Sequence, residues 1–138
     1  MSLSDAKKRQ VFERADGCCE YCRLSADEAS VVFHVDHFIP LKHDGTDDDD
    51  NLCLACFDCN MYKSHDLTGF DPQTDEITPL FNPRLQNWTE HFALSDNMQI
   101  EGLTPQGRTT VRVLKMNLGE RVEDRRALAT LGVYPCDR

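Results

Sequence analysis

The 138-residue sequence contains no apolar run of the roughly 18–20 residues that cross a bilayer. It also lacks the apolar stretch of a secretory signal peptide, because residues 1–14 are mostly polar and charged. We therefore expect a cytoplasmic protein that makes no contact with a membrane. Hydrophobic residues form 40% and charged residues 28% of the chain, which is typical of one globular domain over residues 1–138.

Basic residues are scarce, with 15 lysines and arginines against 24 acidic residues and a net charge of -9. Surfaces that bind phosphate normally carry excess positive charge, so this balance disfavours simple nucleic-acid binding. Part of the excess is local, because residues 47–50 are all aspartate. We expect this run to be a solvated loop rather than a second metal site. Arg84, Arg108, Arg112 and Lys115 could form a local basic strip that compensates for this balance.

Cysteine, by contrast, is abundant, with seven in the chain. Four of them form two Cys-x2-Cys pairs, Cys19 with Cys22 and Cys56 with Cys59. Clustered cysteines in a chain without a signal peptide favour metal binding over disulfides. Structural zinc takes four such thiolates in a tetrahedral shell, which leaves no open position for chemistry. We therefore predict one structural Zn²⁺ on these four sulfur atoms.

The other three cysteines have less defined roles. Cys18 could replace Cys19 as the partner of Cys22, and this alternative stays open. Cys53 alternates with leucines in an expected strand and should pack in the core. Cys136 lies in the C-terminal tail and is expected to be a free thiol.

The segment between the two cysteine pairs is longer than in common zinc ribbons, so it must fold as a unit. Residues 31–35 are β-branched and aromatic and predict a strand, and residues 51–55 predict a second one. Residues 38–50 contain proline, glycine and the aspartate run, which indicates a loop. A short helix is expected over residues 60–64.

Outside that segment the sequence predicts a less regular periphery. Ser4 and Thr104 are typical residues to cap a helix, and Pro105 suits the first helical position. The expected elements are a helix from Ser4 to about Arg14, an ordered linker over 66–83, a hairpin of 88–94 and 99–103, a helix beginning at Thr104 and a last helix over 120–131.

Four residues between and beside the cysteine pairs suit phosphodiester hydrolysis. This reaction needs a base that deprotonates water, stabilisation of charge on the phosphate, and alignment of both groups. His37 can be the general base near neutral pH. Asp36 and Asn60 offer oxygen ligands to a hard cation such as Mg²⁺. Asn51 could hydrogen-bond the loop or the ring of His37.

Several neighbouring residues allow more than one interpretation. His65 could bind the metal in place of Asn60. Lys63 could contact substrate phosphate, or stabilise the C-terminal end of the short helix through its charge. For Trp88 and Phe92, packing in the core is favoured over stacking with bases.

These residues resemble the HNH endonuclease family. The family's motifs run Asp-His-x-x-Pro, then Asn-Leu, then Cys-x2-Cys-Asn-x2-Lys, and the chain has Asp36-His37-x-x-Pro40, Asn51-Leu52 and Cys56-x2-Cys59-Asn60-x2-Lys63. The preceding Cys19-x2-Cys22 matches the zinc-bearing branch of the family. The family name HNH stands for His, Asn and His, and the third residue here is Asn60, as in the HNN variant of the family. The resemblance covers residues 17–66.

The resemblance implies an α+β fold with a small ββα-metal core, also called a His-Me finger, over residues 17–66. It implies one catalytic Mg²⁺ or Mn²⁺ with Asp36 and Asn60 as ligands. His37 would be the general base, and Asn51 the orienting residue. Residues 81–138 resemble an extension of some short bacterial HNH proteins and should pack on the core.

Together these features predict an endonuclease that hydrolyses phosphodiester bonds in nucleic acid, with DNA preferred over RNA as the substrate. The alternative is a catalytically inactive, zinc-stapled module that binds nucleic acid or protein, which the acidic balance favours. Retention of Asp36, His37, Asn51 and Asn60 together disfavours that alternative. A homodimer through the C-terminal helices would be compatible with the nuclease and would present two active sites.

Overall fold

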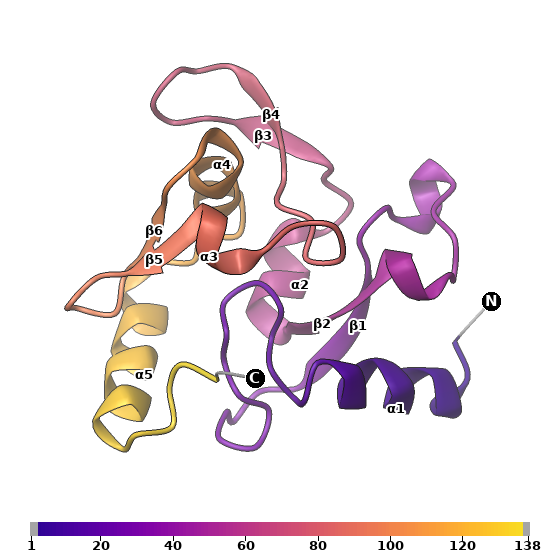
Figure 1. The fold of residues 1–138 in the computed structure, drawn as a ribbon, viewed down its shortest axis with the longest axis horizontal. Helices are drawn as coiled ribbons and strands as arrows, with labels where there is room; N and C mark the ends of the chain where they lie inside the picture. The colour runs from indigo at the N-terminus through magenta and orange to yellow at the C-terminus, as the bar shows by residue number, and fades with distance from the viewer. Residues whose placement is uncertain (1–2, 137–138) are drawn as a thin grey trace.

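The computed structural model describes residues 3–136 and has an α+β architecture of short helices and three separate two-stranded antiparallel sheets (Figure 1). Within these residues, no helix combines the length and the apolarity needed to cross a membrane. The elements in chain order are α1 (Asp5–Arg14), β1 (Phe33–His37), η1 (Leu41–His43), η2 (Asp49–Asn51), β2 (Leu52–Cys56), α2 (Phe57–Lys63), β3 (Thr68–Phe70), β4 (Ile77–Pro79), α3 (Trp88–His91), β5 (Phe92–Leu94), β6 (Ile100–Gly102), α4 (Pro105–Val113) and α5 (Gly119–Thr130).

The predicted helix caps are confirmed. The Ser4 side chain accepts a hydrogen bond from the Lys7 amide and begins α1. Gly17, at φ +72°, carries the chain out of that helix in a left-handed conformation that glycine adopts without strain. The Thr104 side chain accepts from the Gly107 amide and begins α4.

A hairpin of β1 and β2, followed by α2, forms the centre of the chain. Its register pairs Phe33 with Cys56 and His37 with Leu52. β1 thus starts two residues later than predicted and runs through Asp36 and His37. The helix also starts earlier than predicted, because the Cys56 sulfur accepts from the Cys59 amide and caps it.

The prediction of a linker over residues 66–83 is wrong in part. β3 and β4 pair there as a hairpin, with Phe70 opposite Ile77. Asp71 holds its turn by accepting hydrogen bonds from the Gln73 amide and the Thr74 hydroxyl. Such side-chain turns form without the apolar alternation that marks longer strands.

The hairpin predicted over 88–94 and 99–103 is present but shorter. Residues Trp88–His91 form the helical turn α3, and only Phe92–Leu94 pairs with Ile100–Gly102. Trp88 packs beside Phe92, with ring centroids 5.1 Å apart, so the expected role in packing is confirmed.

One apolar cluster connects the C-terminal elements with the cysteine pairs. It contains the buried side chains of Tyr21, Phe81, Phe92, Leu114 and Met116 together with Cys19, Cys22, Cys56 and Cys59. Cys53 is also fully buried in this cluster, as predicted. A smaller cluster, of Val11, Leu52 and Leu54, lies under α1. The C-terminal residues therefore pack on the same core as the β1–β2 hairpin.

A disulfide joins Cys18 to Cys136, so the prediction of a free thiol at Cys136 is wrong. The tail after α5 returns to the first cysteine pair: the Tyr134 hydroxyl donates to the Cys22 carbonyl over 2.7 Å, and the Cys136 amide donates to the Arg23 carbonyl over 2.8 Å. These contacts bring together two cysteines that are 118 positions apart in the sequence. They also remove Cys18 as the alternative partner of Cys22.

Candidate metal centre and active site

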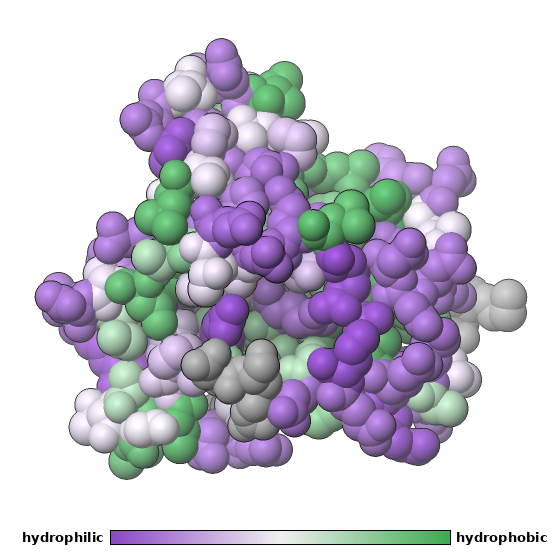
Figure 2. All heavy atoms as spheres, in the orientation of Figure 1, coloured by the Kyte–Doolittle hydropathy of each residue, from purple (hydrophilic) through white to green (hydrophobic). Residues whose placement is uncertain are grey.

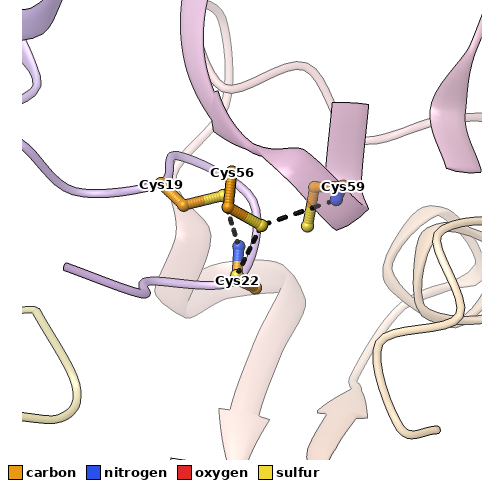
Figure 3. Close-up of side chains that lie close together, drawn as sticks. All are labelled: Cys19, Cys22, Cys56 and Cys59. Atoms are coloured by element: carbon orange, nitrogen blue, oxygen red, sulfur yellow. Dashed lines mark hydrogen bonds between the residues drawn. The ribbon is translucent and has the colours of Figure 1, made fainter. Parts of the chain in front are cut away.

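The four cysteines of the two Cys-x2-Cys pairs converge in one buried cluster (Figure 3). All four sulfur atoms lie within 4.8 Å of one another, and the Cys22 and Cys56 sulfurs are 3.7 Å apart. A tetrahedral zinc site with Zn–S bonds of about 2.3 Å requires sulfur–sulfur separations of about 3.8 Å. The donor set and its spacing therefore fit a structural Zn²⁺.

Each pair forms the same tight turn. The Cys22 amide lies 3.5 Å from the Cys19 sulfur, and the Cys59 amide lies 3.5 Å from the Cys56 sulfur. Backbone amides that point at sulfur stabilise its thiolate form, which is the form that binds metal. The loop after α1 supplies the first pair, and the β2–α2 junction supplies the second.

Arg121 of α5 reaches this cluster, a contact that the sequence did not indicate. Its Nη2 donates to the Cys59 sulfur over 3.0 Å, and its Nη1 donates to the Leu114 carbonyl over 2.6 Å. Burial alone would lower the pKa of Arg121, but the cysteine sulfurs around it, Cys59 first, raise it. The cation thus lies beside the sulfurs and links α5 to the metal centre.

A separate open cavity of about 400 Å³ lies beside β1 and α2. Asp36 and His37, at the end of β1, line it together with Asn60 and His65. Three of the four residues predicted to act in catalysis therefore share one cavity, and the alternative metal ligand His65 lies there too.

Asp36 is 6% exposed and holds one carboxylate oxygen toward the core. Its Oδ2 accepts a hydrogen bond from the Tyr21 hydroxyl over 2.9 Å and lies 3.5 Å from Lys63 Nζ. Burial raises the pKa of Asp36, while Lys63 and Tyr21 oppose that shift. Among the described residues no hydrogen bond reaches Oδ1, so this oxygen can serve as a metal ligand.

His37 is oriented by an aspartate from the loop. Its Nε2 lies 2.7 Å from Asp47 Oδ1. A carboxylate only accepts, so this contact favours the tautomer that carries its proton on Nε2. The lone pair is then on Nδ1, which is the arrangement that a general base needs.

Asn51, which is buried, fixes the loop rather than the imidazole ring. Its Oδ1 accepts from the Ile39 amide over 2.8 Å, and its Nδ2 donates to the Ile39 and Thr46 carbonyls over 3.0 and 2.8 Å. These bonds close the segment between β1 and β2 beside Asp47. Asn51 therefore holds the loop that carries Asp47, the residue in contact with His37.

The comparison with protein families agrees with this geometry, since residues 19–66 match the family model described as HNH endonuclease. The matched segment, residues 19–66, is called the HNH domain. The chain is 29% identical to the Septu protein PtuB of Bacillus thuringiensis over 118 residues, which cover 83% of this chain and 42% of that protein. It is 24% identical to the Septu protein PtuA of Bacillus mycoides (strain KBAB4) over 137 residues, covering 80% of this chain and 19% of that protein. The chain thus spans less than half of each relative, and no solved structure matches it.

Lys63 of the HNH domain has a different position from the one expected for a substrate contact. Its side chain is fully buried, and its Nζ donates to the Phe38 carbonyl over 2.9 Å. It lies beneath Asp36 and balances the charge of that carboxylate. A phosphate at the surface would not reach this ammonium group, because a lysine at this depth is covered on all sides.

Two of the four basic residues considered for a compensating strip, Arg84 and Arg108, are paired with carboxylates. Arg108 makes a bidentate pair with buried Asp71, at 3.0 and 2.8 Å. Lys115 lies over the Tyr62 ring. Arg84 instead forms an ion pair with Glu20 of the first cysteine turn.

Two contacting residues were not among the predicted ones: Asp47, beside His37, and Arg121, beside the cysteine sulfurs. Asp47 could have been suspected, because it lies in the loop that returns from His37 to Asn51 in an expected hairpin. Arg121 carried no such signal, since nothing in the sequence indicates that α5 packs on the cysteines.

Proposed function

We propose that the chain is a metal-dependent endonuclease that hydrolyses phosphodiester bonds in nucleic acid. We favour DNA over RNA as the substrate. The observation that carries this proposal is the shared cavity of Asp36, His37 and Asn60 at the end of the HNH hairpin. A base and two oxygen donors face one open space, which is large enough for a phosphate group and water.

His37 takes the part of general base. Its Nδ1 lone pair accepts the proton of the attacking water, and Asp47 stabilises the imidazolium that results. Asn51 keeps the loop closed, so that Asp47 remains hydrogen-bonded to His37 Nε2 during the reaction. The base needs no rearrangement before the reaction, because these contacts are already present.

Asp36 Oδ1 and the Asn60 side-chain oxygen are the ligands for a catalytic Mg²⁺ or Mn²⁺. Both are hard oxygen donors of the kind that would hold Mg²⁺ or Mn²⁺ at this cavity. When bound, such an ion polarises the phosphate and stabilises charge on the leaving oxygen. Tyr21 and Lys63 hold Asp36 in position and favour its ionised form.

Zn²⁺ on the four cysteines is proposed as a purely structural ion. The thiolates fill its shell, so the ion contributes to folding and not to hydrolysis. It would join the loop after α1 to the β2–α2 junction, at the end of the hairpin where Cys56 pairs with Phe33.

A nicking assay with supercoiled plasmid tests the proposal. The wild type should nick in Mg²⁺ or Mn²⁺ and not without an added divalent ion. Asn60→Ala should require a higher Mg²⁺ concentration for the same rate, because one ligand is lost. Met61→Ala is the matched control, since its side chain lines the same cavity without a donor for Mg²⁺. Wild type that binds nucleic acid but never nicks would contradict the nuclease and favour the inactive binding module.

A further inference from the structure

Two parts of the chain line the active-site cavity. β1 and the η1 turn that follows it supply Asp36, His37 and Lys42. α2 and the residues directly after it supply Asn60 and His65. A strand of nucleic acid that enters the cavity therefore meets side chains beyond the proposed metal ligands and the base, and one of them is a cation.

Lys42 is the cation that a substrate in this cavity can reach. It is the only lysine or arginine among the lining residues in the described part of the chain, and it is exposed. Within residues 3–136, its ammonium group takes part in no hydrogen bond, ion pair or ring contact. Lys63, by contrast, is fully buried and donates to the Phe38 carbonyl. A phosphate in the cavity can therefore contact Lys42 and not Lys63.

Two carboxylates of the β1–β2 hairpin and its loop have cations of their own. Asp36 is the only carboxylate among the cavity-lining residues in the described ranges, and its Oδ2 lies 3.5 Å from Lys63 Nζ. Asp49 forms an ion pair with Lys7 over 2.7 Å, and this contact lowers the pKa of Asp49. The charge of Lys42 is thus uncompensated by the residues around the cavity, although the whole chain has a net charge of -9.

The backbone that carries Lys42 is held in a closed turn. The Pro40 carbonyl accepts from the amides of His43 and Gly45, over 2.9 and 3.0 Å. A Cβ atom at Gly45 would lie 1.7 Å from the Ile39 carbonyl oxygen, so this close approach requires glycine. Because the turn is already closed, a phosphate that binds Lys42 has to order only its side chain, which reduces the entropy cost of binding.

Apolar side chains reach the surface beside Lys42. Leu41, its neighbour in η1, is 54% exposed, and Met61 of α2 is 47% exposed, and both line the cavity. Figure 2 shows hydrophobic side chains at the surface between the β3–β4 hairpin and the loop from β1 to β2, in the upper right of the view. A free phosphate ion has no apolar surface to place against them, whereas the sugars and bases of a polynucleotide have one. The surroundings of Lys42 therefore favour a nucleic-acid strand over a small anion.

We propose that Lys42 binds a phosphate group of the nucleic-acid strand that the active site cuts. A lysine ammonium is a compact point charge that commonly binds phosphate in proteins. This inference rests on the proposed nuclease function, and it gives Lys42 the substrate contact that the sequence suggested for Lys63. The contact is electrostatic, so it contributes affinity that depends on salt and carries no base preference.

Anisotropy of a fluorescein-labelled DNA duplex, without added divalent ions and across a range of salt, measures this contact apart from cutting. Lys42→Gln should weaken binding by about tenfold and reduce the salt slope by about one. Lys42→Arg keeps the charge and should bind nearly as tightly as the wild type. Lys8→Gln is the matched control, because Lys8 is also an exposed lysine but lies on α1, outside the active-site cavity. It should bind like the wild type.

A Lys42→Gln protein that matches Lys8→Gln in affinity and in salt slope would overturn the proposal. Weaker binding of adenosine monophosphate by Lys42→Gln, with unchanged duplex binding, would also overturn it and would assign Lys42 to a free nucleotide. Plasmid nicking by the same wild-type preparation keeps the two hypotheses apart. Nicking with equal duplex binding by the two glutamine variants contradicts only the role of Lys42, and weakened binding by Lys42→Gln without nicking by the wild type contradicts only the nuclease.

Discussion

Arg121 should control how firmly the four cysteines hold zinc. Its guanidinium donates to the Cys59 sulfur over 3.0 Å and is itself fixed by the Leu114 carbonyl at 2.6 Å. Arg121→Met keeps the apolar stem of the side chain but removes the cation and its hydrogen bonds to sulfur and to the Leu114 and Lys115 carbonyls. We expect the variant to fold around zinc and to lose the metal more readily than the wild type.

The size of the effect follows from these contacts. A hydrogen bond to a charged group contributes about 1.5–3 kcal/mol, which corresponds to roughly 10–100-fold in an equilibrium constant. Loss of a residue that supports metal ligands typically weakens metal binding by the same 10–100-fold, roughly. Zinc transfer to a chromogenic chelator, followed by absorbance, should therefore show affinity reduced by about one to two orders of magnitude.

Arg126→Met is the matched control, because Arg126 lies on the same helix, is exposed, and donates to the Asn97 carbonyl rather than to a cysteine. Its zinc affinity should equal that of the wild type. If Arg121→Met and Arg126→Met release zinc identically, the contact between α5 and the cysteines has no energetic role, and the reasoning is refuted.

Three further predictions concern the loop, the base and the acid response. Asn51→Ala removes three hydrogen bonds and should lower the free energy of unfolding by about 2–4 kcal/mol, measured by urea titration. An unchanged urea midpoint would count against the role of Asn51 in closing the loop. Asp47→Asn should lower the nicking rate by a factor within the roughly 10²–10⁴-fold that a general base contributes, whereas Asp48→Asn should not. Arg108 holds the pKa of the Asp71 carboxyl well below its usual value, so the pair stabilises the folded chain above about pH 4 and is lost as pH falls through the folded pKa. Asp71→Asn should therefore lower Tm at neutral pH, with a gap to wild type that narrows in acid; a gap that widens in acid would reverse the sign of this linkage.

Short-range features of the fold could be predicted from the sequence because they depend on a few neighbouring residues. Ser4 and Thr104 cap their helices through side-chain bonds three residues away. The two Cys-x2-Cys turns follow from their spacing, and an antiparallel hairpin between them brings the pairs together. Asp36 and His37 lie at the end of β1 because they directly follow the β-branched and aromatic residues of that strand in the sequence.

Features that depend on distant packing could not be predicted. Arg121 lies 62 positions from Cys59, and the disulfide closes 118 positions, so neither leaves a local pattern. Lys63 was expected either to contact phosphate or to stabilise the end of the short helix. Its full burial was not foreseen, since lysine is rarely buried without a partner, and here the Asp36 carboxylate is that partner. The hairpin of β3 and β4 was missed because its turn is held by a side chain.

The central claim is that His37 is the base of a metal-dependent nuclease. The most direct measurement compares the rate of plasmid nicking in Mg²⁺ or Mn²⁺ by the wild type and by His37→Ala, with both preparations shown to retain zinc. Nicking by the wild type, reduced by roughly 10²–10⁴-fold in His37→Ala, is the predicted result. Equal nicking by two folded, zinc-loaded proteins would contradict the account, because another group would then have to deprotonate the water.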